Sequence, residues 1–333
     1  MIYRNLGRTS VRVSSLCLGT MAFGRQADEP VAHAIMDRAV EGGITFFDTA
    51  NVYNDGESER IVGRWLAQSR RRDEIFLATK FGNERANPVH GQGLSRRHVI
   101  AECDASLLRL QTDRIDLYQV HRMWPGTQID ELFRALDDLV RAGKILYIGT
   151  SKWAPPLIAE VVALCDRYGW TKPVTEQPPY NLLDRRVEDE LLWTCNRYGI
   201  GVIPWAPIAA GVLSGKYGEG SFDDRSRFGD WNHRCTPEAV DAVELLRPLA
   251  EEKGVTLAEL ALAWVMNQPA VTAPIVGPRT VDQLVSSLKA VDIELTRDDY
   301  ERIDSIFPPG SHLSDYWEGN VYSMLRRQLG IER

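Results

Sequence analysis

The sequence predicts an α/β fold, a (β/α)₈ barrel of the TIM type, in which eight parallel strands are each followed by a helix. Eight short apolar runs alternate with amphipathic helical patterns along the chain, and eight is the number of units that closes such a barrel. The alternative is a doubly wound sheet. It is disfavoured because residues 18–24 lack the spacing of a Gly-x-Gly-x-x-Gly loop and no Walker-type loop occurs.

Residues 1–14 precede the barrel and read as a β-hairpin, because two alternating runs flank a turn at Gly7. The predicted barrel strands are 16–20, 44–48, 75–80, 115–121, 145–150, 173–177, 200–205 and 271–276. The predicted helices lie near 29–41, 57–69, 95–110, 128–142, 155–168, 185–198, 237–267 and 279–290. Capping signals at Ser95, at Thr127 with Glu131, and at Thr236 with Pro237 support three of these helices.

Two segments interrupt the strand–helix alternation. Residues 207–236, after the seventh strand, form a long, glycine-rich loop, and residues 308–333 form a C-terminal tail that we expect over the barrel mouth. The tail carries Tyr316, Trp317 and Tyr322, an aromatic content that argues against disorder. Residues 1–333 are expected to form one domain, since single barrels of this length are common.

The composition is that of a globular protein, with 44% hydrophobic and 26% charged residues. A net charge of −7 gives no support to a nucleic-acid partner, and no apolar run is long enough to span a bilayer. The N-terminus has no apolar core of a signal peptide. Five scattered cysteines without a Cys-x-x-Cys pair indicate reduced thiols, no metal site and a cytoplasmic location.

Polar side chains stand where consecutive predicted strands end. Asp48 ends the second strand with Tyr53 five residues beyond it, Lys80 ends the third strand, and His121 ends the fourth. Each alone has an ordinary structural explanation, such as a solvated lysine or a core histidine. Because the strand ends of a barrel meet at one face, we expect the four groups to converge there.

The four groups together predict proton delivery to a carbonyl oxygen. A phenol is a poor acid at neutral pH, and an ammonium such as that of Lys80 would lower the pKa of Tyr53. Asp48 would hold Lys80, and His121 would bind the substrate oxygen or relay a proton. An acid of this kind serves carbonyl reduction, in which hydride must come from a cofactor.

The chain resembles the aldo-keto reductase family over nearly its full length, in the branch that includes the β subunits of voltage-gated potassium channels and bacterial reductases. The matching stretches are Leu18 to Met21, Phe47 to Ala50 with Tyr53, Ala78 to Gly82, Asp116 to His121, Gly149 to Ser151, Gln177 with Tyr180 to Leu183, and Gly211 with Gly215 to Tyr217. The resemblance implies a catalytic tetrad of Asp48, Tyr53, Lys80 and His121 and the cofactor NADPH, extended across the barrel mouth.

The resemblance also implies the cofactor contacts. They are Gly19, Thr20, Met21, Asp48, Ser151, Lys152, Gln177, Trp205, Ala206, Pro207, Ile208, Ala209, Leu213, Lys216, Gly277, Arg279, Gln283 and Ser287. Trp205 would stack on the nicotinamide, and Arg279 suits a 2′-phosphate. Lys152 and Ser287 stand where many members have asparagine. Lys152, with Trp205, is similar to the branch named above, whereas Ser287 removes an implied adenine contact and leaves the preference between NADPH and NADH open.

Aromatic residues beyond the strand ends are candidates for a substrate pocket. With Tyr53 and His121, the candidates are Phe23, Trp124, Trp153, Trp231 and Trp317. The sequence therefore predicts a cytosolic, NADPH-dependent reductase of aldehydes or ketones. The alternatives are a cofactor-sensing regulatory subunit and a Schiff-base aldolase with Lys80 as nucleophile. The carbonyl substrate, the reaction direction and homo-oligomerisation remain open.

Overall fold

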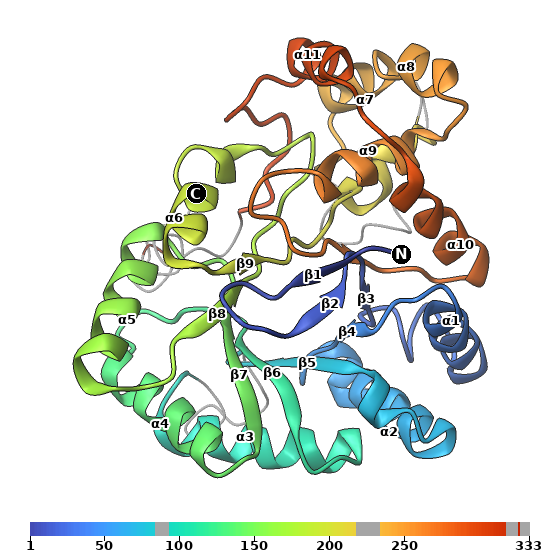
Figure 1. The fold of residues 1–333 in the computed structure, drawn as a ribbon. Helices are drawn as coiled ribbons and strands as arrows, with labels where there is room; N and C mark the ends of the chain where they lie inside the picture. The colour runs from blue at the N-terminus through green and yellow to red at the C-terminus, as the bar shows by residue number, and fades with distance from the viewer. Residues whose placement is uncertain (84–92, 218–233, 318–325, 327–333) are drawn as a thin grey trace.

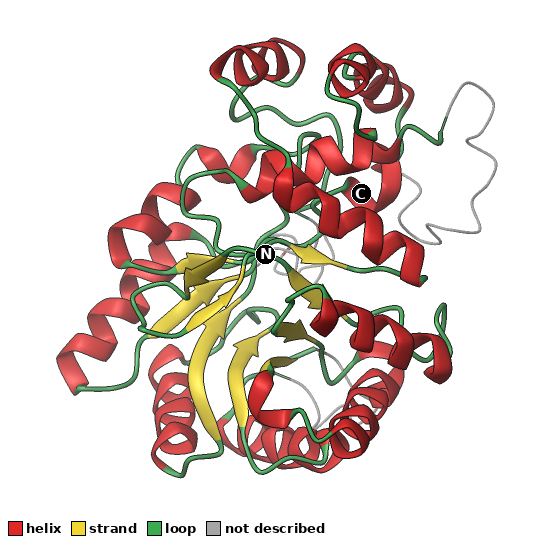
Figure 2. Ribbon diagram, turned by 45° about the vertical axis from the view of Figure 1, so that its right-hand side comes forward, coloured by secondary structure: helices red, strands yellow, loops and turns green. Residues whose placement is uncertain are grey.

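The computed structural model describes residues 1–83, 93–217, 234–317 and 326, with strands at the centre and helices outside them (Figures 1 and 2). Eight parallel strands pair in the order β10-β3-β4-β5-β6-β7-β8-β9. Their bounds are β3 Cys17–Gly19, β4 Phe46–Asp48, β5 Phe76–Phe81, β6 Ile115–Val120, β7 Ile145–Thr150, β8 Pro173–Glu176, β9 Gly201–Val202 and β10 Ile275–Val276. Each lies within or beside a predicted run, and the (β/α)₈ class is confirmed.

The first and last strands of this order are joined by single contacts rather than by a ladder. Val202 of β9 forms an isolated parallel bridge with Val271. The backbone N–H of Thr272 donates to Val202 O at 2.7 Å, and that of Ile275 donates to Pro204 O at 2.8 Å. These bonds close the sheet on itself, so that its strand ends form a ring.

Helices follow the strands as expected, with three differences. The helices are α1 Glu29–Glu41, α2 Glu57–Ser69, α3 Arg96–Leu110, α4 Ile129–Arg141, α5 Pro155–Tyr168, α6 Leu191–Tyr198, α7 Pro237–Glu244, α8 Arg247–Glu252, α9 Leu257–Met266, α10 Val281–Lys289 and α11 Arg297–Ile306. The single helix predicted over 237–267 is three helices, and α11 was not predicted. The helix predicted over 185–198 is α-helical only over Leu191–Tyr198, with a short 3₁₀ segment, Arg186–Glu188, before it. The caps at Ser95 and Thr236 are confirmed, whereas the predicted cap at Thr127 is wrong. Gln128 occupies the N-cap position of α4 without a side-chain capping hydrogen bond, and Thr127 donates to Trp124 O.

Alternation along each strand separates the barrel interior from the layer beneath the helices. In β4, the outward Phe47 packs on Trp65 of α2 with ring centroids 5.5 Å apart. The inward Phe46 belongs to a second cluster with Cys17, Ala78 and others that fills the barrel. Because side chains alternate with a period of two, Asp48 also points inward. The same alternation turns Lys80 of β5 inward, because it lies two residues beyond the inward Ala78.

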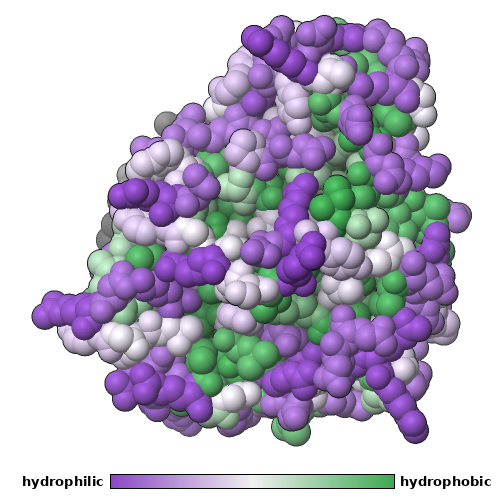
Figure 3. Space-filling view, viewed as in Figure 1, coloured by the Kyte–Doolittle hydropathy of each residue, from purple (hydrophilic) through white to green (hydrophobic). Residues whose placement is uncertain are grey.

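The predicted N-terminal hairpin is present and closes the end of the barrel away from the strand exits. It pairs β1, Tyr3–Asn5, with β2, Arg12–Ser14, in antiparallel register. Leu6 and Val13 are fully buried and belong to the interior cluster. Figure 1 shows the hairpin lying across the strands, and Figure 3 shows this face covered mostly by polar side chains with apolar ones between them. The strand exits therefore lie at the opposite end of the barrel.

Gly7 is the point of closest approach between the hairpin turn and the barrel. Its φ is +53°, and an added Cβ would lie 2.5 Å from Val174 O and 2.7 Å from Gly199 O. Gly7→Ala is expected to lower the free energy of unfolding by about 3 kcal/mol, because left-handed strain and overlap with rigid backbone add. Urea unfolding measures the change. Gly143→Ala is the control, because Gly143 has φ +72° with nothing within 4 Å, and should cost only about 1 kcal/mol.

Candidate active site

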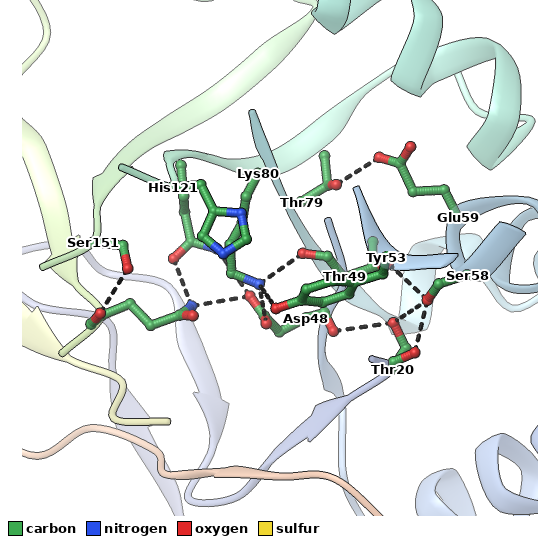
Figure 4. A network of polar contacts seen from close by, with 12 residues as sticks. Thr20, Asp48, Thr49, Tyr53, Ser58, Glu59, Thr79, Lys80, His121 and Ser151 are labelled. Carbon is green, nitrogen blue, oxygen red and sulfur yellow. Dashed lines mark hydrogen bonds and ion pairs between the residues drawn. The ribbon is translucent and has the colours of Figure 1, made fainter. Parts of the chain in front are cut away.

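The Lys80 ammonium group lies inside the barrel with an acceptor for each of its three protons. Nζ is 2.5 Å from Oδ2 of Asp48, 2.8 Å from the carbonyl oxygen of Thr49 and 3.0 Å from the hydroxyl oxygen of Tyr53 (Figure 4). Lys80 is fully buried and Asp48 is 2% exposed. A buried charge is costly unless it is paired and hydrogen-bonded, and this one is both. The predicted pairing of Asp48 with Lys80 is confirmed.

Tyr53 begins a short 3₁₀ helix, Tyr53–Gly56, beyond β4. Its hydroxyl oxygen accepts from Lys80, and its ring stands 4.8 Å from Nζ. Asn54 follows at φ +49°, and its amide nitrogen donates to Met21 O at 3.1 Å and to Phe23 O at 2.5 Å. Asn54 thus ties the segment carrying Tyr53 to the loop after β3.

The pKa of Tyr53 lies above its ordinary value, contrary to the lowering expected from the sequence. Burial raises the pKa of the phenol most, the Lys80 ammonium offsets part of the increase, and Asp48 adds to it. Burial opposes the charge of Lys80, but Asp48 and Tyr53 outweigh it and raise the pKa of the ammonium. At neutral pH the pair is therefore a protonated phenol beside a protonated amine.

Two glutamines that sequence reasoning did not connect with Asp48 hold its other oxygen. Nε2 of Gln119 donates to Asp48 Oδ1 at 2.9 Å, and Nε2 of Gln177 donates to the same atom at 3.1 Å. The Gln177 side chain also donates to Gln119 Oε1, and the backbone carbonyl oxygen of Gln177 accepts from Ser151 Oγ. Strand alternation carries the signal for Gln119, because it lies two residues before His121 and faces the same side. The Gln177 amide nitrogen thus points to Asp48.

His121 directly follows β6 and stands edge-on to Tyr53, with ring centroids 5.9 Å apart and planes at 84°. Its Nδ1 lies 2.9 Å from Nδ2 of Asn83, a residue absent from the sequence-predicted site. Burial, and then the charges of Lys80, Lys152 and Arg122, hold the pKa of His121 well below its usual value. The imidazole is therefore neutral at neutral pH, and the structure brings the predicted tetrad together.

A second layer of hydrogen bonds supports the site from the helix side. Glu59 of α2 accepts from Thr79 Oγ1 at 2.6 Å and from Arg109 Nε at 2.5 Å, and Figure 4 shows Thr79 and Glu59 beside the site. Ser58 shares hydrogen bonds with Thr20 and Thr49 at 2.7 and 3.1 Å. These bonds fix α2 against the ends of β3, β4 and β5, and they restrict the movement of the strand ends that carry the charged pair.

The residues that the resemblance assigns to a cofactor lie at the strand exits and on α10. Gly19 ends β3 and Thr20 follows it, Ser151 and Lys152 follow β7, and Gln177 follows β8. Met21 and Lys216 are exposed. Trp205, Ala206, Pro207, Ile208, Ala209 and Leu213 follow β9, the last two within the 3₁₀ segment Ala209–Ser214. The ring of Trp205 is 6.1 Å from that of Tyr316 in the tail.

Gly277 and Arg279 lie between β10 and α10, Gln283 lies in the first turn of α10, and Ser287 lies in its last turn. Oε1 of Gln283 accepts from the Arg279 N–H at 2.8 Å, and Ser287 Oγ donates to Gln283 O within the helix. Gly277 is open, since an added Cβ would meet nothing within 4 Å. Arg279 lies just before the N-terminus of the nine-residue helix α10, and a cation at a helix N-terminus is a donor set that fits an anionic phosphate.

The aromatic substrate candidates fall into three groups. Trp124 and Trp317 are half-buried beyond the strand ends. Phe23 and Trp153 have no exposed surface, and Trp153 packs edge-on against Phe133 of α4. The expectation that these two rings line an open pocket is therefore wrong for this structure, because they pack in the core. Trp231 lies outside the described residues.

The described part of the tail reaches the exit face as expected. Leu313 N–H donates to Leu183 O at 2.8 Å, and Tyr316 N–H donates to Asp184 Oδ2 at 3.0 Å, so the tail follows the loop after β8. Tyr316 is fully buried against Trp205. The long loop after β9 is described only in part, since residues 218–233 fall outside the described ranges.

Glu176, at the end of β8, is a buried acid that sequence reasoning missed. It accepts from Thr150 Oγ1 at 2.5 Å and from Trp153 N–H at 3.1 Å. Burial raises the pKa of its carboxyl group to about 7, and the hydrogen bonds lessen the increase. A folded-state pKa above the unfolded one means that the folded protein keeps this proton longer. Its contribution to stability is therefore complete below about pH 4.5 and is lost as the pH rises through about 7.

Glu176→Gln should remove this pH dependence. The parent is expected to lose on the order of 3 kcal/mol of unfolding free energy between about pH 4.5 and 7 through this group, whereas the neutral amide cannot ionise. Denaturant titrations at several pH values measure the difference. Glu238→Gln, at an exposed position on α7, is the control and should leave the slope unchanged. If the free energy of unfolding changed equally with pH in the parent and in Glu176→Gln, the pH dependence would not come from Glu176.

Two kinds of feature are absent from the described residues. No helix among them combines the length and apolar character needed to cross a membrane. Within the same residues, no three His, Cys, Asp or Glu side chains are grouped so that they could hold a metal ion.

Comparisons with known proteins agree with the geometry. The model of the Aldo/keto reductase family matches residues 15–307. An uncharacterized oxidoreductase, YrpG, of Bacillus subtilis is 41% identical over 327 residues, covering 93% of this chain and 97% of the relative. Probable voltage-gated potassium channel β subunits of Oryza sativa and Arabidopsis thaliana are 36% and 37% identical, covering 92% and 88% of this chain and 96% and 92% of theirs.

Proposed function

Because the chain belongs to the aldo/keto reductase family, we propose that it reduces an aldehyde or ketone to the alcohol, with NADPH as the reductant and Tyr53 as the proton donor. The family supports oxidoreduction with a nicotinamide cofactor. The specific chemistry is supported by the site itself, in which a phenol, an ammonium and an imidazole meet at the exit face of the barrel.

The observation that carries the proposal is the hydrogen bonding of Lys80. An ammonium group has three protons and no lone pair, and these three protons have Asp48, Thr49 and Tyr53 as acceptors. Tyr53 can therefore only accept from Lys80, and its own proton remains available for a bound oxygen. A phenolate that forms after proton transfer would stay 3.0 Å from a permanent positive charge.

The proposed roles of the other residues follow from the contacts of Lys80 and Tyr53. Asp48 keeps Lys80 charged and in place, and Gln119 and Gln177 keep Asp48 in place. Neutral His121 orients the carbonyl oxygen beside Tyr53. The nicotinamide cofactor supplies the hydride when bound. Arg279 and Lys216 are proposed to hold its phosphates, and Arg279 favours the 2′-phosphate of NADPH over NADH.

The same contacts weigh against a Schiff-base aldolase. A lysine nucleophile must be an unprotonated amine, whereas Asp48 raises the pKa of Lys80 and all three of its protons have acceptors. A cofactor-sensing subunit is the other alternative, since two relatives are named as channel β subunits. A complete set of proton-transfer groups favours an enzyme. We propose a cytosolic location, which the free thiols of all five cysteines support.

The test is an assay of cofactor oxidation with a panel of aliphatic and aromatic aldehydes and ketones. Absorbance at the nicotinamide band is followed with NADPH and with NADH in parallel. We expect turnover with several aldehydes and a lower KM for NADPH. Arg279→Gln should raise the KM for NADPH and leave that for NADH nearly unchanged. Tight NADPH binding without turnover across the panel would favour the sensing subunit.

A further inference from the structure

The side chain of Asn83 contacts the histidine of the site. Nδ2 of Asn83 lies 2.9 Å from Nδ1 of His121. The backbone holds the two segments together, because the His121 N–H donates to the carbonyl oxygen of Phe81 at 2.8 Å, the last residue of β5. Asn83 follows that strand end by two residues. One ring nitrogen of His121 is thus engaged by the protein.

With the Asn83 amide oriented as in the structure, this contact selects one tautomer of a neutral ring. An imidazole without charge has one N–H and one lone pair, and the amide nitrogen of Asn83 can only donate. Nδ1 of His121 must then accept, so the ring hydrogen lies on Nε2. With the amide turned over, its oxygen would accept a hydrogen bond from a protonated Nδ1, and Nε2 would be left as an acceptor. A carbonyl oxygen only accepts hydrogen bonds, so only the first arrangement can bind it.

We propose that Asn83 is a positioning residue that holds His121 as the Nε2–H tautomer, so that Nε2 donates to the carbonyl oxygen that Tyr53 protonates. The identity of that ligand and the choice between the two amide orientations rest on the proposed function, whereas the tautomer itself can be observed without any substrate. In this proposal Asn83 affects catalysis only through the His121 ring. The tautomer can therefore be tested in the absence of any turnover.

The first test is ¹⁵N NMR of the His121 ring, assigned by its loss in His121→Gln. In the parent we expect a protonated Nε2 and an unprotonated Nδ1 at pH 7. In Asn83→Asp the carboxylate should accept from Nδ1, move the hydrogen to that atom, and raise the proton affinity of the ring at least about 10-fold. The parent tautomer with an unchanged titration in Asn83→Asp would overturn the proposal.

The second test is the pH dependence of kcat/KM for an aldehyde that the parent reduces. Asn83→Asp should lower kcat/KM by about 10- to 100-fold and add an ionisation near neutral pH, whereas Asn83→Leu should cost about 10-fold without one. Asn196→Asp makes the same charge change at an exposed position of α6 and is the control. A new ionisation in the control as well, or none in Asn83→Asp, would argue against the proposal.

A double-mutant cycle separates positioning from general damage. In a His121→Ala background, Asn83→Asp should cause no further loss of kcat/KM, because its effect passes through the ring. An equal loss in both backgrounds would mean a structural role. If the tautomer result held but Tyr53→Phe kept full activity, the proposed function would fail and the assignment of Asn83 would survive.

Discussion

Replacing Tyr53 with phenylalanine is expected to lower kcat for carbonyl reduction by about 10³-fold, within the range for loss of a general acid. The change deletes one hydroxyl group and leaves the ring beside Lys80 and His121. Binding of NADPH, followed by its fluorescence, should stay within about threefold of the parent. The loss should therefore fall on the chemical step, measured as single-turnover cofactor oxidation.

The direction of the pKa shift sharpens this expectation. Because burial and Asp48 raise the pKa of Tyr53, the phenol is fully protonated at neutral pH and the parent rate of reduction should not fall until alkaline pH. Tyr168→Phe, at a half-exposed ring at the end of α5, controls for the loss of a hydroxyl group elsewhere and should leave the single-turnover rate unchanged. Near-parental single-turnover rates in Tyr53→Phe would remove Tyr53 as the acid.

The sequence was most informative where a residue type is unusual for its setting. A carboxylate at the end of an apolar strand required a partner, and the order of the strands placed Lys80 beside it. Strand alternation places Gln119 on the same side as His121, but it does not identify the partner of Gln119. Asn83 carried no signal in the sequence, because an amide in a strand or loop is common and reveals its partner only in three dimensions. The direction of the Tyr53 pKa also needed the structure, since burial outweighs the neighbouring charge.

The helices differ from the prediction where helix-breaking and helix-capping residues divide an apolar pattern or begin a polar one. Pro248 lies at the start of α8, and Gly254, at φ +66°, lies between α8 and the capping residue Thr256 of α9. These residues divide the apolar pattern over 237–267 into three helices. α11 begins with a capping box of Thr296 and Asp299, a signal that sequence reasoning missed in a strongly polar segment.

Lys80→Met is expected to abolish measurable reduction and to destabilise the fold by about 3 to 5 kcal/mol. It removes the cation from a fully buried pair and leaves the carboxylate of Asp48 facing only Gln119 and Gln177. Tyr53 also loses the charge that would stabilise its phenolate. Thermal unfolding and urea titration measure the stability, and cofactor oxidation measures the activity.

The double variant Asp48→Asn with Lys80→Met separates the two effects. Without either charge, the site holds neutral groups of nearly the same volume, and the oxygen of the introduced amide can still accept from the two glutamine side chains. Stability should therefore recover by at least half of the single-variant loss, because an unpaired buried carboxylate costs more than a neutral amide.

Activity should not recover with stability, because the function of Lys80 is to place a positive charge at the Tyr53 oxygen. Destabilisation by Lys80→Met and rescue by the double variant would show that the pair is a buried charge pair within the fold. Persistent inactivity of a well-folded double variant would then assign that charge to catalysis. If the rescued protein reduced carbonyls at the parental rate, the proton would have to reach the substrate without Lys80, and the site would work by another route.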